Sequence, residues 1–393
     1  MHIEQEAVDD DSFYYTDAIS DQAVDYIKQQ AESDEPFFLY TAYTAPHWPL
    51  QARDSDIAKY KGRFDVGWDE LRRRRLDRLR ESGVLAQGWD LSQRDPAQPA
   101  WEEARDKEWQ ARRMEVYAAQ ITVMDEGIGR VISALEETGQ LDDTVVIFLA
   151  DNGGCAEELS SGWLANRPEP FFYRGKARNG EPVRFGNSPD IEPGSEYTYT
   201  SYGVPWANLS NTPFRMYKHW THEGGIATPL IVNWPAGLKS EHGALHHDPA
   251  QLPDVMATVL DVTGAAYPEE YNGNEIAPME GESLLPVLQG GDYDRKPLFW
   301  EHEGNAAMRD GRWKLVKNFT GVSSATPGFD PPGRRGEWEL YDMEADRTEL
   351  HDLAETEPAR VESMAGEYER WAERCGVKDR ERILANPAER MDR

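Results

Sequence analysis

The sequence predicts an α/β protein in which a layered α/β/α region, residues 1–292, precedes a smaller antiparallel-sheet region, residues 293–393. The apolar, β-branched run Val145–Ala150 has the pattern of a strand buried on both faces of a parallel sheet. The helical spacing of apolar residues over Ala111–Thr138, just before that run, completes a helix-to-strand unit. After about Arg295 the pattern changes to short strands and turns, which indicates an antiparallel meander.

The remaining elements follow from the same periodicities. Further helices are predicted at Tyr15–Ser33, Pro253–Val262 and Pro358–Cys375. Two more apolar runs, Pro36–Tyr43 and Thr228–Pro235, are predicted to be buried strands of the same sheet. The meander is predicted from four short runs, at 298–301, 306–309, 313–316 and 338–342.

Composition limits the classes of partner. The chain has 393 residues with 72 acidic and 42 basic side chains, a formal net charge of −30, which would repel nucleic acid and anionic membranes. Its two cysteines define neither a disulfide framework nor a cysteine-based zinc site. No apolar run reaches membrane-spanning length, and residues 1–12 lack the parts of a signal peptide. We therefore expect a soluble, non-exported chain if Met1 is the true start; a complete parent could be periplasmic or secreted.

The first candidate site is the tip of the predicted strand at 145–150. Asp151 and Asn152 follow this strand, and Gly153 and Gly154 allow a tight turn. Ligands bind at the carboxyl edge of open α/β sheets, and carboxylate and amide oxygens suit calcium or magnesium. An ordinary Asx turn remains the alternative for these four residues.

Two further candidates lie elsewhere in the chain. His47 stands between two prolines just after the predicted strand Pro36–Tyr43, so its imidazole sits on a stiff turn. It is either a structural histidine or an acid, base or anion contact. Lys218 precedes the Gly224-Gly225 turn and is either an anion ligand or a surface lysine.

Two segments between these sites are open to more than one interpretation. The basic run Arg72–Arg75 is expected to pair with nearby acids on a solvated face, with an acidic partner as the alternative. Residues 155–212 are rich in glycine, proline, asparagine and serine, which indicates either an active-site wall or a surface loop. The aromatic residues of this loop are Phe171, Phe172, Tyr173, Tyr197, Tyr199, Tyr202 and Trp206.

Four segments resemble the sulfatase family of the alkaline-phosphatase superfamily, and bacterial arylsulfatases most closely. They are PFFLYTAYTAPHWPLQA, LDDTVVIFLADNGG, NTPFRMYKHWTHEGGI and LYDMEADRTELHDLA, and the resemblance covers nearly the whole chain. It implies an alkaline-phosphatase-like α/β/α sandwich that acts on a sulfate-ester small molecule or a sulfated glycan. It also implies that Asp151 and Asn152 are two ligands of a calcium ion. His47 and Lys218 would contact the sulfate group, either could protonate the leaving group, and His222 would be a further pocket residue.

The sequence departs from the family pattern at the nucleophile. The family uses a formylglycine made from the Cys or Ser of a C/S-x-P-x-R motif. Cys155 and Cys375 do not stand in such a motif, and Asn211-Thr-Pro-Phe-Arg215 begins with a residue that cannot be oxidised to the aldehyde. We expect the family's N-terminal part to be absent, because Met1 is internal to a longer enzyme or the gene is truncated.

Three hypotheses remain open on this sequence. The first is a sulfuric ester hydrolase present as its C-terminal portion. The second is a phosphodiesterase or phosphonate hydrolase of the same superfamily. The third is an inactive calcium- or anion-binding module.

Overall fold

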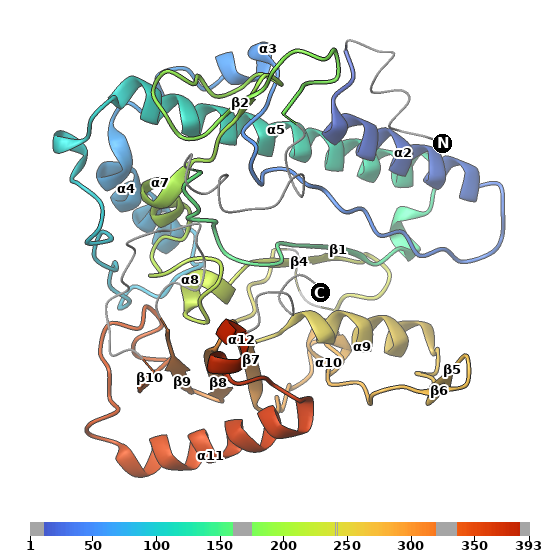
Figure 1. Cartoon of the computed structure of the whole chain (residues 1–393). Coiled ribbons are helices and arrows are strands. Elements are labelled where there is room, and N and C mark those ends of the chain that lie inside the picture. Colours follow the sequence, from blue (N-terminus) through green and yellow to red (C-terminus); the bar gives the residue numbers. More distant parts are fainter. Residues whose placement is uncertain (1–11, 160–174, 240, 242, 320–335, 386–393) are drawn as a thin grey trace.

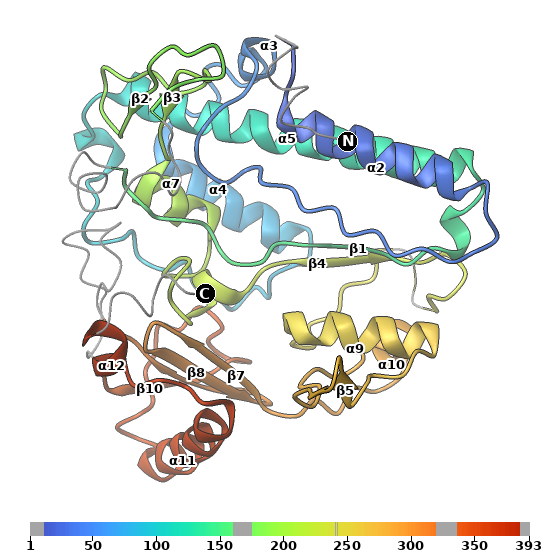
Figure 2. The same cartoon turned by 45° about the vertical axis from the view of Figure 1, so that its right-hand side comes forward.

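The computed structural model describes residues 12–159, 175–239, 241, 243–319 and 336–385 (Figure 1). Helices α2 (Tyr15–Gln30) and α5 (Lys107–Glu137) lie side by side on one side of a central two-stranded sheet, with α9 (Leu252–Thr263) on the other (Figure 2). The α/β/α layering expected from the sequence is thus present. No helix in the described part of the chain is both long and apolar enough to cross a membrane.

Local signals in the sequence set the ends of these helices. Helix α9 begins with a capping box, in which the side chains of Gln251 and Asp254 each accept a backbone N–H of the first turn. It ends at Gly264 with a left-handed φ of 69°. The pair α2 and α5 packs through a buried cluster that contains Ile27, Ala134 and Leu135. The apolar stripes predicted for these helices therefore face the core in part, whereas Tyr26 and Ile121 are 51% and 37% exposed.

The central sheet differs from its prediction. β1 (Val146–Leu149) pairs with β4 (Leu230–Asn233), and the two strands run antiparallel with Val146 opposite Asn233. The expectation of a fully buried parallel strand is therefore wrong, because the strand's pairing depends on a partner more than 80 residues away rather than on its own apolar run. Ile231 of β4 is 58% exposed.

The predicted strand Pro36–Tyr43 is also wrong as a strand. This segment runs alongside β1 in both views (Figures 1 and 2), but within the described residues it makes no ladder bonds and carries no strand assignment. Its alternate side chains Phe38 and Tyr40 are 76% and 80% exposed. Leu39 alone packs against the α2–α5 cluster. The apolar run therefore predicts neither the burial nor the hydrogen-bonded pairing of this segment.

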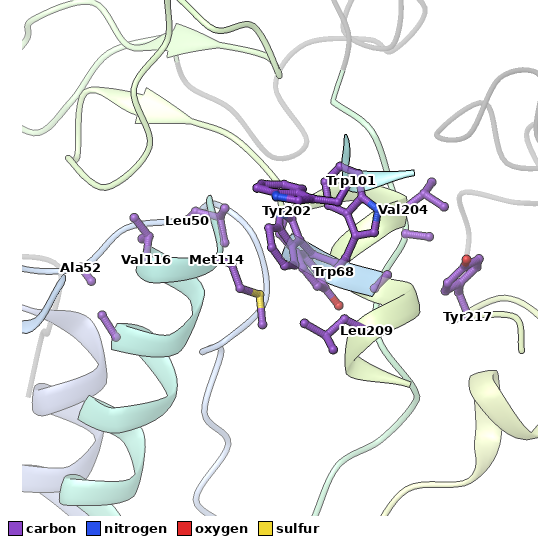
Figure 3. Close-up of a cluster of buried hydrophobic side chains, with 14 of the residues drawn as sticks. Leu50, Ala52, Trp68, Trp101, Met114, Val116, Tyr202, Val204, Leu209 and Tyr217 are labelled. Carbon is purple, nitrogen blue, oxygen red and sulfur yellow. The ribbon is translucent and has the colours of Figure 1, made fainter. Parts of the chain in front are cut away.

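A cluster of tryptophans forms the main core beside α5 (Figure 3). Trp68 of α4 (Gly67–Glu81) meets Trp101 and Trp206 edge to face, with ring centroids 4.7 and 5.4 Å apart. Trp206 belongs to α7 (Gly203–Ser210), which is buried along nearly its whole length. Part of the loop predicted at 155–212 is therefore core helix rather than surface.

This core also corrects two smaller expectations. Arg72 is not on a solvated face: it is buried on α4 and donates to the carbonyl and hydroxyl of Ser92, at 2.9 and 2.8 Å. Tyr202 is buried with the tryptophans, whereas Phe171, Phe172 and Tyr173 lie outside the described residues. The short elements of this region are α3 (Asp54–Ala58), η1 (Trp101–Glu103), η2 (Leu141–Asp143), β2 (Arg184–Phe185), β3 (Thr198–Tyr199), α8 (Glu223–Ile226), β5 (Glu270–Tyr271), β6 (Asn274–Glu275) and α10 (Leu285–Leu288).

The C-terminal meander is confirmed as a four-stranded antiparallel sheet in the order β10-β9-β8-β7. Alternate residues face opposite sides, as the period of two requires. Met308, Leu315 and Leu340 pack against helix α11 on one side, while Ala307, Val316 and Tyr341 form a second cluster. The elements are β7 (Leu298–His302), β8 (Asn305–Asp310), β9 (Trp313–Lys317), β10 (Trp338–Asp342), α11 (Pro358–Cys375) and α12 (Arg380–Ala385).

Candidate functional site

Two glycine pairs bring the tip of β1 against the turn that contains α8. The N–H of Gly153 donates to the carbonyl of Gly225 at 2.9 Å. A Cβ placed on Gly153 would lie 1.8 Å from the carbonyl oxygen of Gly224, so no other residue fits without moving the backbone. The close contact of these two backbones fixes the Asp151–Gly154 turn against the segment that carries Lys218.

Lys218 is held in place by the same turn. Its backbone N–H donates to the carbonyl of Gly154 at 3.1 Å, and the N–H of Gly154 donates to Asn211 Oδ1 at 2.8 Å. The Lys218 ammonium then reaches the imidazole of His47, with 3.3 Å between Nζ and Nε2. Two candidates that are 171 residues apart in sequence are thus in direct contact.

The hydrogen bonds around His47 define its protonation. Its Nδ1 lies 2.8 Å from the carbonyl of Trp48, so Nδ1 carries a proton and Nε2 accepts from Lys218. Burial of the ring lowers the pKa of His47, and the positive charge of Lys218 lowers it further. These effects outweigh the Trp48 carbonyl and the carboxylates of Glu157 and Asp151. In the free site His47 is therefore a neutral imidazole beside an ammonium, not the imidazolium that charge stabilisation alone suggests.

A buried carboxylate that the sequence reasoning missed lies beneath this pair. Glu157 accepts from Trp48 Nε1 at 2.8 Å, from the Cys155 thiol at 3.1 Å and from His219 Nε2 at 3.4 Å. Burial opposes its ionisation, but the bond from His219, the Lys218 charge and the Cys155 bond lower the pKa of Glu157 to about 2. In the sequence, Glu157 is a single acidic residue at the start of a loop-like region, and no motif marks it as a buried acceptor.

Cys155 is a buried thiol rather than a thiolate. Burial raises its pKa to about 12, and the neighbouring Glu157 carboxylate acts in the same direction. A protonated thiol is a poor nucleophile, so this cysteine offers no obvious covalent chemistry.

Asp151 and Asn152 stand at the edge of the same region. Asp151 is exposed, Asn152 is partly buried, and the described residues give neither side chain a hydrogen bond or ion pair. Asp151 is near enough to His47 to act on its pKa. Their oxygens fit a hard cation in type, but two donors are well short of the six to eight oxygens that calcium takes.

His222 lies elsewhere, in the seam between α8 and the C-terminal sheet. Its ring has no exposed surface, and its Nε2 lies 3.1 Å from Glu339 Oε2 on β10. Glu339 also accepts from Arg215 at 2.6 Å and from the Tyr341 hydroxyl at 2.6 Å. The structure does not bring His222 to the Lys218–His47 pair, and a fully buried ring lacks the access that a substrate contact needs.

The next residue, Glu223, also contacts the C-terminal sheet. Its carboxylate lies 2.7 Å from Lys314 Nζ and 3.1 Å from Arg347 Nε, and Lys314 also meets Glu349 at 2.8 Å. Arg347 and Glu349 belong to the LYDMEADRTELHDLA segment, whose charge pattern was the signal available in the sequence. We call the segment His222–Gly225 the HEGG turn. Its histidine and glutamate attach it to the C-terminal sheet, while its two glycines contact the tip of β1.

The sequence matches the models of one protein family. Residues 3–265 match the sulfatase family model, and residues 214–367 match the model for the C-terminal region of N-sulphoglucosamine sulphohydrolase. The chain belongs to the sulfatase family.

Individual relatives agree with this assignment. An uncharacterised sulfatase of Schizosaccharomyces pombe is 30% identical over 358 residues, 88% of this chain and 59% of the relative. An arylsulfatase of Klebsiella aerogenes is 32% identical over 288 residues, 70% of this chain and 56% of the relative. The chain therefore spans between half and three fifths of the length of these two relatives.

Solved structures share the fold. The crystal structure of Ps i-CgsB aligns with a TM-score of 0.53 and 22% identity, over 91% of this chain and 55% of that chain. A candidate sulfatase of Bacteroides fragilis aligns with a TM-score of 0.51 and 19% identity, over 91% of this chain and 58% of that chain.

Proposed function

We propose that this chain carries the sulfate-binding part of an arylsulfatase-like sulfuric ester hydrolase site. The observation that supports the proposal is the contact between Lys218 Nζ and His47 Nε2, 3.3 Å apart and next to the Asp151 turn. An ammonium and an imidazole that takes up a proton at Nε2 would offer two donors to an anion that inserts between them. The substrate would be an aryl sulfate or a sulfated sugar.

The pair has a defined part in the chemistry. Cleavage of the S–O bond places negative charge on the leaving oxygen, and Lys218 stabilises the sulfate oxygens as a fixed cation. A bound anion raises the pKa of His47, because negative charge favours the imidazolium. Nε2 then carries a proton towards the leaving oxygen, while the Trp48 carbonyl holds Nδ1–H and keeps the ring oriented.

Asp151 and Asn152 would hold a calcium ion, or magnesium, as two members of a larger ligand set. The ion supplies additional positive charge against the sulfate oxygens. No residue of 1–393 is assigned the covalent step, because neither cysteine stands in the formylglycine motif. We therefore expect residues 1–393 to bind aryl sulfates and to hydrolyse them at a negligible rate.

Binding of 4-nitrophenyl sulfate to purified 1–393 tests the proposal by calorimetry, with turnover followed in parallel as released nitrophenol. A charge-assisted hydrogen bond is worth about 1.5–3 kcal/mol, so Lys218→Ala should weaken binding about 10- to 150-fold. Lys296→Ala is the control, since that lysine is 80% exposed and is ion-paired with Glu282. Equal affinity of the wild type and Lys218→Ala would refute the assignment.

The same measurement separates the alternative functions. Tighter binding of bis(4-nitrophenyl) phosphate than of the sulfate would favour a phosphodiesterase. Strong turnover that Lys218→Ala abolishes would show that the chain holds a nucleophile, or that water attacks directly. Binding without any turnover fits both an inactive anion-binding module and the sulfate-binding part proposed above.

A further inference from the structure

We propose that His219, His302 and Glu303 form a transition-metal site, for which zinc is the best fit. The donor atoms of the three side chains all lie within 4.8 Å of one another. His219 Nδ1 is 3.2 Å from His302 Nε2 and 3.9 Å from Glu303 Oε2. In a tetrahedral zinc site with bonds of 2.0–2.2 Å, ligand atoms are about 3.3–3.6 Å apart, and two histidines with one glutamate are a known zinc ligand set.

The backbone presents these side chains from two tight turns. His302 ends β7 opposite Asn305, the first residue of β8, so the hairpin loop contains only Glu303 and Gly304. Both loop residues have positive φ, 53° and 88°, as a two-residue mirror-image turn requires. The loop therefore fixes His302 and Glu303 relative to each other.

The backbone of the third ligand, His219, is also fixed by its contacts. His219 adopts a φ of 88°, which is rare and strained for a residue with a side chain. Asn305 Nδ2 donates to the His219 carbonyl at 2.9 Å, which ties this residue to the same hairpin. Such a conformation persists only where surrounding contacts impose it, and here they direct the ring to the hairpin.

Glu157 sets which nitrogen of His219 faces the cluster. Its Oε2 accepts from Trp48 and Cys155, and its Oε1 lies 3.4 Å from His219 Nε2. Because a carboxylate that accepts these bonds has no proton to give, Nε2 of His219 is the donor and Nδ1 presents its lone pair to His302 and Glu303. A carboxylate that orients the distal N–H of a histidine is the arrangement found behind metal-bound histidines.

This site does not depend on sulfate binding by Lys218. Three ligands from the described residues leave a fourth position of tetrahedral zinc for water or an oxygen of an anionic ligand. The competing arrangement is a metal-free one, in which His302 donates a simple hydrogen bond to His219. Metal binding by the three side chains therefore distinguishes the two arrangements.

Metal-free 1–393 titrated with Co²⁺ alone, followed by competition with Zn²⁺, distinguishes them. We expect one Co²⁺ per chain with the visible absorption of a tetrahedral ion, displaced by Zn²⁺. His302→Ala should remove this absorption. Glu157→Gln should weaken the affinity about 10- to 100-fold, because it removes the carboxylate that orients His219. Lys218→Ala should retain the absorption, which separates this inference from the proposed sulfate site.

His246→Ala/His247→Ala is the matched control, because these two histidines are adjacent and exposed. Thermal unfolding without metal tests whether each variant folds. If His302→Ala does not fold, Glu303→Gln takes its place. The proposal is overturned if no tetrahedral absorption develops, if the absorption survives both His302→Ala and Glu303→Gln, or if the control variant abolishes it.

Discussion

Lys314 of β9 is a lysine with no exposed surface, and its replacement tests whether ion pairs hold the C-terminal sheet to the HEGG turn. Its ammonium lies 2.7 Å from Glu223 and 2.8 Å from Glu349. In Lys314→Met the aliphatic volume is largely kept, so little packing is lost. The charge is removed, Glu223 keeps Arg347 at 3.1 Å, and Glu349 loses its ion pair with Lys314. Breaking a buried pair in this way costs about 3–5 kcal/mol.

Urea unfolding at pH 7, followed by tryptophan fluorescence, measures this loss as a change in the free energy of unfolding. Lys296→Met is the matched control, because Lys296 is also 2.7 Å from a glutamate, Glu282, but is 80% exposed. An exposed pair of this kind contributes about 0–1 kcal/mol. The two lysines differ in burial and not in distance, so a loss below about 1 kcal/mol for Lys314→Met would refute the reasoning.

Two further predictions concern pH and calcium. Burial opposes ionisation of Glu339, but the hydrogen bond and charge of His222 and the charge of Arg215 lower its pKa to about 2, below the ordinary 4.5. Its contribution to stability is therefore present above pH 4.5 and is lost as the pH falls towards 2. Unfolding free energies measured between pH 6 and 2 should fall less steeply for Glu339→Gln than for the wild type, and identical slopes would contradict this. Calcium binding by 1–393 should be weak, since Asp151 and Asn152 offer two oxygens where six to eight are needed. Tight, stoichiometric calcium binding in calorimetry that Asp151→Ala abolishes would show that other residues complete the shell.

The sequence was sufficient for elements whose signals are local. Helix α11 runs from Pro358 to Cys375 as predicted, since a proline at its start and a glycine after its end mark its bounds. The four strands of the meander follow from runs with turns between them. Pairing was not predictable in this way, because β1 and β4 are brought together by the glycine contact at their ends and not by their own composition.

The site was only partly predictable for a related reason. His47 and Lys218 each follow a recognisable turn, and their meeting required only that both turns lie at one edge of the fold. His222 lies only four residues after Lys218 in the same motif, yet its side chain is buried between α8 and the C-terminal sheet. Glu157 and His302 have no motif, and their roles depend on three-dimensional contacts alone.

These contacts give the C-terminal sheet a part in the site. The HEGG turn is bound on one side to the β1 tip through its glycines and on the other to β9 and β10 through His222 and Glu223. The β7–β8 hairpin reaches the same turn through the bond from Asn305 to His219. Lys218 directly precedes His219, so we expect a displacement of the sheet also to displace the ammonium from His47. If Lys218 and His47 form the proposed anion site, we expect the sheet to support it, and the ion pairs of the sheet would then contribute to function through position as well as to stability.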